Sequence, residues 1–391
     1  MRIALLAWEA LESTPVSDVA WHISGLARNL AKRGHEVHLF TPLADGKKPD
    51  EEVLAVRIHR VPFASHPHFV DQVQFLCRAL AERASRAERE AGPFDILHAH
   101  DWVTCNAGVW AGETLHRPLV VTFHSIEQAR CGFRTLSPEE RRIADHEANG
   151  ARHAARVIVV SHTLRHDAMK AIELPDWRVE VVFNGVEAAA YEGFIDPGKV
   201  KARYGAAPIE PLILFVGQLE YRLGADLLVD AAPQILQARP QARLLLAGDG
   251  PMRNALEERA RRLGVAHAVR FAPLPVGHER IDLFRAADIV VFPARNDPFR
   301  MAVLEAWAAG KPVVATQTGG PGEYIWHDVT GVHVQDTPES LAWGVEHLAA
   351  DPDRARWVGA NGRAAVHAAF TWDRAAAHTE EIYRRALAAE E

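Results

Sequence analysis

Two successive stretches of this chain each alternate short apolar runs with longer amphipathic patterns, and this alternation constrains the fold more than any other feature. Residues 3–8 form an apolar run typical of a buried parallel strand, a helical pattern follows at 18–33, and a second strand-like run occupies 36–41. A strand, a helix and a second parallel strand form a right-handed crossover. The sequence therefore predicts an α/β fold with a doubly wound sheet.

The alternation continues in both stretches. In the first stretch we expect further strands at 53–61, 96–98, 119–123, 157–160 and 179–183, and helices at 70–90, 104–112, 138–154 and 163–171. In the second stretch we expect strands at 212–216, 243–247, 269–271, 289–292, 313–315 and 331–334, and helices at 225–237, 252–263, 277–286, 299–309, 340–348, 352–370 and 372–389. These patterns predict two Rossmann-like domains facing a cleft, at 1–190 and 211–370, with a linker at 191–210 and a C-terminal helix at 371–391 that crosses back to the first domain.

Bulk properties narrow the class of protein. A formal net charge of −7 and the lack of any Lys/Arg block argue against a nucleic-acid partner. The three cysteines form no CxxC motif, so we expect a reducing, cytoplasmic setting. No signal peptide and no apolar span of 18 residues is evident, which predicts a chain without a transmembrane segment. Whether it forms a homo-oligomer is left open.

Ligands of doubly wound sheets bind at the carboxyl ends of the strands, so the residues there matter most. The run from Asp297 to Glu305 follows the apolar run 288–293 and opens a helix that we expect to begin near Pro298. A helix start at a strand end is an anion site, because free backbone N–H groups and the helix dipole point there. The competing interpretation is an ordinary acidic helix N-terminus.

Two histidines, His98 and His100, stand two residues apart at another strand end, beside Asp101. This spacing is compatible with a metal site, but the sequence places no third ligand beside them. We therefore expect the two side chains to pack structurally, and we predict no metal.

Several motifs fall at strand ends in a fixed order. They are H-A-H-D-W at 98–102, T-F-H at 122–124, N-G-V at 184–186, A-G-D-G-P at 247–251, D-P-F-R-M-A-V-L-E at 297–305, A-G-K-P-V-V-A at 309–315 and G-G-P-G-E at 319–323. The set resembles the GT-B glycosyltransferases of the retaining family four, within the group that includes short, archaeal-type glycogen synthases. The family signature is E-P-F-G-x-x-x-L-E followed by A-x-G-x-P-V-V-A, and the resemblance covers nearly the whole chain.

The resemblance implies a hexosyltransferase-type enzyme that needs no metal, with a nucleotide-sugar donor held mostly by the second domain and a carbohydrate or small hydroxyl or amine acceptor held mostly by the first. It implies that Glu305 holds the donor ribose, and it assigns catalytic positions near the sugar to His124 and Asp297. The implied donor-side residues are Gly217, Gln218, Arg222, Phe299, Arg300, Met301, Ala302 and Glu305, and the implied acceptor-side residues are Ser17, Asp18, His100, Asp101 and Glu127. The plainer interpretations are a capping carboxylate at Glu305 and a backbone-bonding histidine at His124.

The chain departs from the family where charge is usually carried. Members place an Arg and a Lys in G-R-L-x-x-x-K-G after the first donor-domain strand, whereas Gln218 and Leu223 stand here. Each such group is worth roughly a hundredfold to a thousandfold in rate. Ser17-Asp18 replaces the family's glycine pair before the first helix, and Arg300 replaces the signature glycine.

Three interpretations follow from these departures. The first is an active retaining glycosyltransferase in which Arg300 or Arg222 supplies the missing charge. The second is a pseudo-glycosyltransferase, a non-catalytic partner or sugar-binding subunit. The third is a changed reaction in the same cleft, such as an unusual coupling or a nucleotide-sugar epimerisation.

Overall fold

The computed structural model describes residues 1–13 and 17–388, and it divides into two compact units. The first unit comprises Met1–Gly185 and the chain from Trp372 onward, and the second comprises Val186–Thr371. Residues 191–210, expected as a linker, lie in the second unit instead and include the α-helix α7 (Pro197–Arg203). The end of the expected C-terminal helix, at 389–391, lies outside the described residues.

The first unit contains a sheet with the strand order β3-β4-β2-β1-β5-β6-β7-β8, in which every pair is parallel except β3 with β4. Its strands are β1 (Arg2–Leu6), β2 (Glu36–Pro42), β3 (Asp50–Val53), β4 (Val56–Val61), β5 (Ile96–His100), β6 (Leu119–Phe123), β7 (Arg156–Val159) and β8 (Val179–Val181). The central strands are buried along their length, as parallel strands covered on both faces must be.

Helices connect these strands. They are α1 (Asp18–Lys32), α2 (Phe69–Ala91), α3 (Trp102–Leu115), α4 (Glu127–Arg130), α5 (Pro138–His153), α6 (His162–Ile172) and the 3-10 helix η1 (Asp176–Arg178). Ser137 begins α5 with a capping box, because its hydroxyl accepts from the Glu140 N–H while the Glu140 carboxylate accepts from the Ser137 N–H. Ser17 and Ser161 cap α1 and α6 in the same general way.

One expected strand of the first unit is wrong. The sequence indicated a single strand at 53–61, whereas the structure has an antiparallel hairpin, β3 and β4, in which Val53 pairs with Val56. The two turn residues, Leu54 and Ala55, have φ values of 50° and 63°. Two-residue hairpin turns with positive φ usually carry Asn-Gly or Asp-Gly, so this pair gave no sequence signal of a turn.

The second unit contains a parallel sheet with the order β11-β10-β9-β12-β13-β14. Its strands are β9 (Leu212–Val216), β10 (Arg243–Ala247), β11 (Val269–Ala272), β12 (Ile289–Phe292), β13 (Val313–Thr316) and β14 (Val332–Val334). Its helices are η2 (Ala188–Tyr191), α7, η3 (Tyr221–Leu223), α8 (Ala225–Ala238), α9 (Arg253–Arg262), α10 (Gly277–Ala286), α11 (Met301–Ala308), α12 (Pro321–Tyr324), α13 (Pro338–Ala349) and α14 (Pro352–Ala369). The sequence order of the strands reverses between β9 and β12, which is where ligands of such sheets bind.

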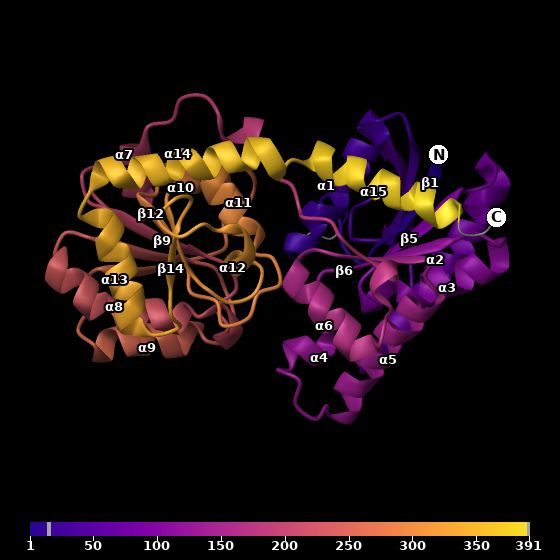
Figure 1. The fold of residues 1–391 in the computed structure, drawn as a ribbon, viewed down its shortest axis with the longest axis horizontal. Coiled ribbons are helices and arrows are strands. Elements are labelled where there is room, and N and C mark those ends of the chain that lie inside the picture. The colour runs from indigo at the N-terminus through magenta and orange to yellow at the C-terminus, as the bar shows by residue number, and fades with distance from the viewer. Residues whose placement is uncertain (14–16, 389–391) are drawn as a thin grey trace. The chain divides into compact units, whose positions relative to one another are not determined.

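The last helix, α15 (Trp372–Leu387), belongs to the first unit and packs on α1, as the yellow and indigo ribbons in Figure 1 show. A Cβ at Gly25 of α1 would collide with the ring of Trp372, so glycine permits this close approach. Arg33, after α1, donates to the Glu380 carboxylate at 2.8 Å. The C-terminal helix is thus part of the first hydrophobic core.

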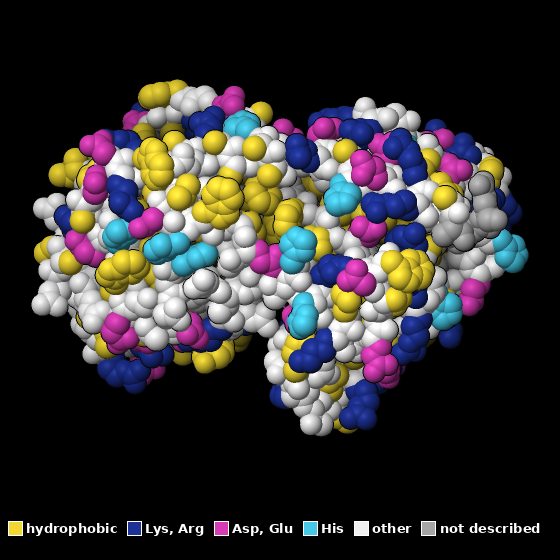
Figure 2. Space-filling model, in the orientation of Figure 1, with side chains coloured by type: hydrophobic (Ala, Val, Ile, Leu, Met, Phe, Trp, Pro, Cys, Tyr) yellow, Lys and Arg dark blue, Asp and Glu magenta, His cyan; other side chains and the backbone are white. Residues whose placement is uncertain are grey.

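Surface and composition give few further constraints. Among the described residues no helix combines the length and apolarity needed to cross a bilayer. Cys77, Cys105 and Cys131 are free thiols. Figure 2 shows Lys and Arg interspersed with Asp and Glu, so the face in view presents no continuous basic surface.

Candidate functional site

The candidate site on the second unit begins where the strand order reverses. Gly217 follows β9, Gly248 follows β10, and the segment from Asp297 follows β12, so three loops meet at the carboxyl edge of the sheet. A Cβ at Gly248 would collide with the Gly217 carbonyl, and one at Gly319 would collide with the Asp297 carbonyl. The backbones therefore pack against one another at this edge, which is the arrangement that exposes N–H groups to a phosphate or sugar.

Asp297 organises the start of α11. Its Oδ1 accepts hydrogen bonds from the backbone N–H groups of Phe299, at 3.1 Å, and Arg300, at 2.9 Å. The helix therefore begins at Met301, and the expected start near Pro298 is wrong. Two of the N–H groups expected to meet the donor are taken by this carboxylate. The N–H groups of Met301 and Ala302 lie in the first turn of α11, whose donors have no partner within the helix.

Arg300 lies inside the second unit, with 6% of its surface exposed. Its Nη2 donates to the Val216 carbonyl at 2.5 Å, its Nη1 lies 3.4 Å from Asp297 Oδ2, and its guanidinium lies over the Phe215 and Phe292 rings. Its backbone φ of 55° is one that glycine adopts easily, in keeping with the glycine of the family signature. The Arg300 guanidinium therefore holds the end of β9 and does not project freely from the start of α11.

Glu305 is also engaged by protein groups. Its Oε1 accepts from Arg280 Nε at 2.7 Å and from the Tyr191 hydroxyl at 2.9 Å, while Arg280 Nη2 bonds Oε2. The side chains of Glu305 and Arg280 are 11% and 7% exposed, so this is a largely buried bidentate pair. Two carboxylate oxygens offer about four acceptor positions, so the pair leaves acceptor capacity for ribose hydroxyls.

The two positions at which family members carry cations, Gln218 and Leu223 here, have different environments. Gln218 is exposed just beyond β9, whereas Leu223 belongs to the hydrophobic core with 3% exposure. Between them, Arg222 on η3 pairs with Glu220 at 2.6 Å and donates to the Asn296 carbonyl at 3.2 Å, with 34% of its side chain exposed. Of the two arginines proposed as substitutes, Arg222 is therefore the accessible one, and it reaches the residue before Asp297.

The acceptor-side predictions fall on several elements of the first unit. Ser17 caps α1 and donates to Glu9, and Asp18 lies in the first turn of α1. Glu127 is 2% exposed and pairs with Arg130 within α4. This pair joins a buried carboxylate to a half-exposed arginine and gives Glu127 a structural role in holding α4.

Asp101 and His124 are joined directly. The Asp101 Oδ1 accepts from the His124 backbone N–H at 2.7 Å, and Asp101 itself has a φ of 57°. Burial raises the pKa of the Asp101 carboxyl to about 7, although backbone N–H groups of His124 and Ser125 act against the shift. This carboxyl therefore changes charge near neutral pH.

His100 and His124 belong to a group of four histidines within the first unit. His22 on α1 and His98 on β5 complete it, and adjacent ring centroids lie 4.1 to 5.9 Å apart. Burial lowers the pKa of His124 to about 3 and holds the pKa values of the other three well below the usual range. All four imidazoles are consequently neutral at ordinary pH.

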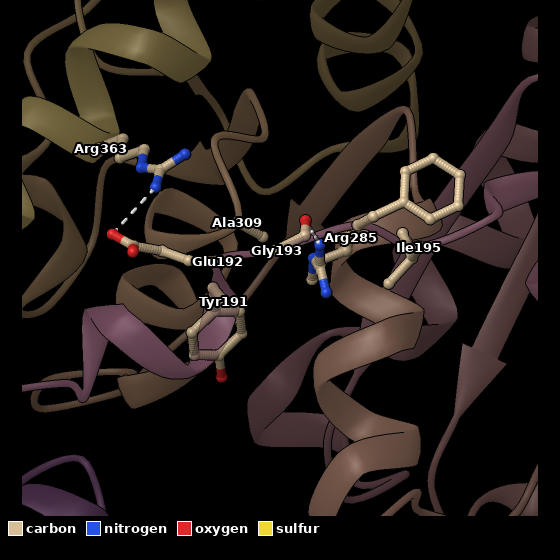
Figure 3. Close-up of a pocket in the computed structure, with 8 residues that line it drawn as sticks. Tyr191, Glu192, Gly193, Ile195, Arg285, Ala309 and Arg363 are labelled. Carbon is tan, nitrogen blue, oxygen red and sulfur yellow. Dashed lines mark hydrogen bonds and ion pairs between the residues drawn. The ribbon is translucent and has the colours of Figure 1, made fainter.

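A separate pocket of the second unit is lined by Tyr191, Glu192, Gly193, Phe194, Ile195, Arg285, Ala309 and Arg363. Figure 3 shows its two arginines already engaged, Arg363 by the Glu192 carboxylate at 3.4 Å and Arg285 by the Gly193 carbonyl. The Tyr191 hydroxyl, which bonds Glu305, points away from these side chains. The pocket therefore lies beside the candidate site without adding a free cation to it.

Comparison with known proteins identifies the family. The Glycosyltransferase Family 4 model matches residues 19–190, and the Glycosyl transferases group 1 model matches residues 199–365. An uncharacterized glycosyltransferase of Methanocaldococcus jannaschii is 33% identical over 99% of both chains. The chain belongs to the group 1 and family 4 glycosyltransferases.

Two further proteins extend this result. A glycogen synthase of Mycobacterium tuberculosis is 28% identical over 98% of this chain and 94% of its own. An Anabaena protein solved with UDP-glucose shares the fold, with a TM-score of 0.79 and 22% identity over 98% of this chain and 99% of that one. The predicted GT-B class, two Rossmann-like units with parallel sheets, is confirmed.

Sequence reasoning missed several residues that shape the candidate site. Arg280 and Tyr191 hold Glu305 from positions 25 and 114 residues away in sequence, and no motif marks either of them. His22, on the first helix, lies beside His100 and His124. The chain has 21 histidines, and nothing in the sequence distinguishes this one. Contacts of this kind come from the packing of distant segments, and a single sequence carries no signal of them.

Proposed function

We propose that this glycosyltransferase moves a hexosyl group from a nucleotide-sugar donor to a hydroxyl-bearing acceptor with retention of configuration, and that the second unit holds the donor. The observation that carries the proposal is the meeting of glycine-rich loops and the α11 start where β9 and β12 diverge. Sheets of this kind bind nucleotides at that point. The Anabaena neighbour of the same fold, solved with UDP-glucose, supports a donor of this class.

Each donor group needs a protein partner in this proposal. Arg222 faces the diphosphate, exchanging its partner Glu220 for phosphate oxygens, because 34% of its side chain is exposed at this edge whereas Arg300 is buried. Glu305 accepts from the ribose hydroxyls, oriented by Arg280 and Tyr191. The first turn of α11 donates N–H groups to the phosphate or sugar. The charge of the leaving diphosphate is thus met by protein groups, and no metal is required at the donor.

The catalytic positions are proposed on chemical grounds. Asp297 is oriented by two backbone N–H groups, so its role is to shape the sugar side of the α11 start. His124 is neutral and half-buried, and it is suited to hydrogen bonding a sugar hydroxyl through a ring nitrogen. Both roles follow from the motifs in which these residues stand.

The test is calorimetric titration of the purified chain with UDP, ADP and GDP and with their glucose derivatives. We expect one class of nucleotide to bind at one site per chain, and its sugar derivative to release the free sugar or extend an added acceptor oligosaccharide. The product anomer, read by NMR, should keep the donor configuration. A folded chain that binds none of these compounds contradicts the proposed function.

The role of Arg222 has a matched control. Arg222→Ala should weaken binding of the preferred nucleoside diphosphate by roughly tenfold to a hundredfold, as expected for a charge-assisted hydrogen bond. Arg239→Ala is the control, because Arg239 also pairs with a glutamate, Glu346, at 38% exposure, but it lies at the end of α8. Equal affinities of both variants and wild type would remove Arg222 from the site while leaving the donor proposal intact.

A further inference from the structure

Four histidines, of which three are buried and His124 is half-buried, gather in the first unit from three separate segments. His22 lies on α1, His98 and His100 lie on β5, and His124 follows β6. The His22 ring lies 4.3 Å from that of His124 and 5.4 Å from that of His100, measured between centroids. Imidazoles are the commonest metal ligands in proteins, so their hydrogen bonds decide what this group can do.

Those hydrogen bonds separate His98 from the other three. Both nitrogens of His98 are engaged, Nδ1 by the Tyr383 hydroxyl at 2.6 Å and Nε2 by Thr122 Oγ1 at 2.7 Å. By contrast, His22 Nε2, both nitrogens of His100 and His124 Nε2 are buried and have no hydrogen-bond partner among the described residues. Buried ring nitrogens without partners are rare, and they commonly indicate an ion or water held at that place.

We propose that His22, His100 and His124 bind a divalent transition metal of the Zn²⁺ class. One ligand atom from each ring lies within 4.8 Å of the other two. Ligands of a tetrahedral Zn²⁺ stand about 2.0–2.1 Å from the metal and therefore somewhat over 3 Å from one another. Binding in this way requires the three rings to rotate so that their nitrogens move closer together than they lie here.

The surroundings orient at least one ligand. His22 Nδ1 lies 2.6 Å from Asn184 Oδ1, and because that amide oxygen accepts only, Nδ1 carries the proton and the Nε2 lone pair faces the other rings. The His124 backbone is fixed by Asp101 Oδ1, and the His100 N–H donates to Thr104 Oγ1 at 2.8 Å. These last two bonds hold the backbones of His124 and His100, whereas the bond to Asn184 orients the His22 ring.

The ligand chemistry selects the metal class. Three neutral imidazoles with no carboxylate among them suit Zn²⁺, Co²⁺, Ni²⁺ or Cu²⁺ and disfavour Mg²⁺ and Ca²⁺, which take oxygen ligands. Three ligands leave a fourth position for water or another small molecule, and half-buried His124 is the member nearest to solvent. The site lies wholly in the first unit and shares His124 with the proposed sugar contact, whereas the donor groups of the second unit take no part in it.

A second group, Glu127, Cys131 and Glu140, also has ligand atoms within 4.8 Å of one another. Its carboxylates are already paired, Glu127 with Arg130 and Glu140 with Arg134. A metal there would displace two arginines, whereas a metal among the histidines would fill unpartnered nitrogens. The histidine group is therefore the stronger site, and the other is a measurable alternative.

The experiment is titration of the chelator-treated full chain with Zn²⁺ against a chromophoric chelator, with Co²⁺ absorption as a report of tetrahedral nitrogen coordination. Wild type should bind one equivalent of Zn²⁺. His22→Ala, His100→Ala and His124→Ala should each weaken it by more than about a hundredfold, since even outer partners of metal ligands cost 10- to 100-fold. His98→Gln, beside the site, and His153→Ala, on the surface, should bind as wild type does.

Circular dichroism and thermal melting establish that each variant is folded before its affinity is compared. His124→Ala is the decisive variant if His22→Ala or His100→Ala does not fold, because its ring is the least buried of the three. A folded wild type that takes up no Zn²⁺ overturns the proposal. So does binding that survives in His124→Ala, or binding that is lost in Cys131→Ser, which would assign the metal to the second group.

Discussion

Glu305 has two roles, one in the stability of the fold and one in the proposed binding of the donor. In the fold, Glu305 neutralises the charge of Arg280, because the Arg280 guanidinium is 7% exposed and bonds this carboxylate bidentately. In the proposed complex, Glu305 accepts hydrogen bonds from the ribose hydroxyls of the donor. The two roles can be measured separately, because the first affects the free energy of unfolding without ligand and the second affects the relative affinities of two ligands.

Removing the negative charge of Glu305 tests its role in the stability of the fold. Glu305→Gln should lower the free energy of unfolding by about 3–5 kcal/mol, the usual cost of leaving one member of a buried ion pair without its counter-charge. Tyr191→Phe removes a single neutral donor to the same oxygen and should cost about 1 kcal/mol. Urea unfolding followed by circular dichroism measures both. Equal, small losses in the two variants would show that Arg280 does not depend on this carboxylate.

Changing the ligand tests the ribose role without changing the protein. The preferred nucleoside diphosphate should bind wild type about tenfold more tightly than its 2′-deoxy counterpart, because one hydrogen bond of about 1–1.5 kcal/mol is lost. Calorimetric competition between the two compounds measures this ratio. A ratio near one would leave Glu305 a purely structural residue.

Asp101 makes stability depend on pH. Its pKa is raised by burial to about 7 in the fold, against about 3.9 in an unfolded chain, so between pH 4 and 7 the folded state binds more protons than the unfolded state. Its contribution to stability therefore falls as pH rises through this window. Asp101→Asn keeps an acceptor for the His124 N–H and tolerates a positive φ, yet does not titrate.

The comparison between wild type and Asp101→Asn isolates the pH-dependent contribution of Asp101 to the free energy of unfolding. We expect the variant to gain about 2–4 kcal/mol relative to wild type between pH 4 and pH 7.5, at about 1.4 kcal/mol per unit of pKa shift. Unfolding curves at a series of pH values measure the difference. A constant difference across that range would show that the carboxyl titrates as it does in the unfolded chain.

At the scale of elements, buried parallel strands were the easiest to predict. The expected strands at 119–123, 212–216, 243–247 and 289–292 coincide with β6, β9, β10 and β12, because apolar runs bounded by turn residues have few other uses. The misses are short or unusual: α4 and α12 span four residues each, and the start of α11 is delayed by the Asp297 cap. These depend on local hydrogen bonds that periodicity does not show.

The β3–β4 hairpin gives a prediction at this scale. Leu54 and Ala55 hold positive φ without being Asn or Gly, which costs about 1 kcal/mol or more for each residue. The paired change Leu54→Asn with Ala55→Gly should therefore raise the free energy of unfolding by about 1–2 kcal/mol. Thermal melting measures the gain. The same change at Lys47–Lys48 is the control, since neither residue has positive φ, and a gain of the same size there would contradict the turn assignment.

At the scale of the whole molecule, the sequence predicted the two Rossmann-like units and which candidate residues would lie at the ends of strands, because both follow from patterns along the chain. It did not predict which side chains those residues would meet. His22 and His100 are 78 positions apart, and Arg300 fills space beneath Gly217, 83 positions earlier. Such meetings are set by how the sheet and helices pack, and each of them changed the interpretation of a motif residue.

The return of the chain to the first unit leads to the last prediction. α15 buries Trp372, Ile382 and Tyr383 at 7%, 0% and 0% exposure, and the Tyr383 hydroxyl meets His98 Nδ1. Burying a large apolar side chain contributes about 1.5–3 kcal/mol, so losing three of them removes much of the 5–15 kcal/mol that stabilises a typical domain. A chain ending at Thr371 should lose hydrogen-exchange protection throughout β5 and α1.

The second unit should keep its protection in the same truncated chain, because the Val186 N–H to Phe370 carbonyl bond and the Val186–Thr371 bridge lie within it. A chain ending at Leu387 is the control and should match the full chain in every peptide. Hydrogen exchange read by mass spectrometry resolves the two units peptide by peptide. Loss of protection in both units alike would mean that they unfold as one cooperative body, and unchanged protection in β5 would mean that the first core is complete without α15.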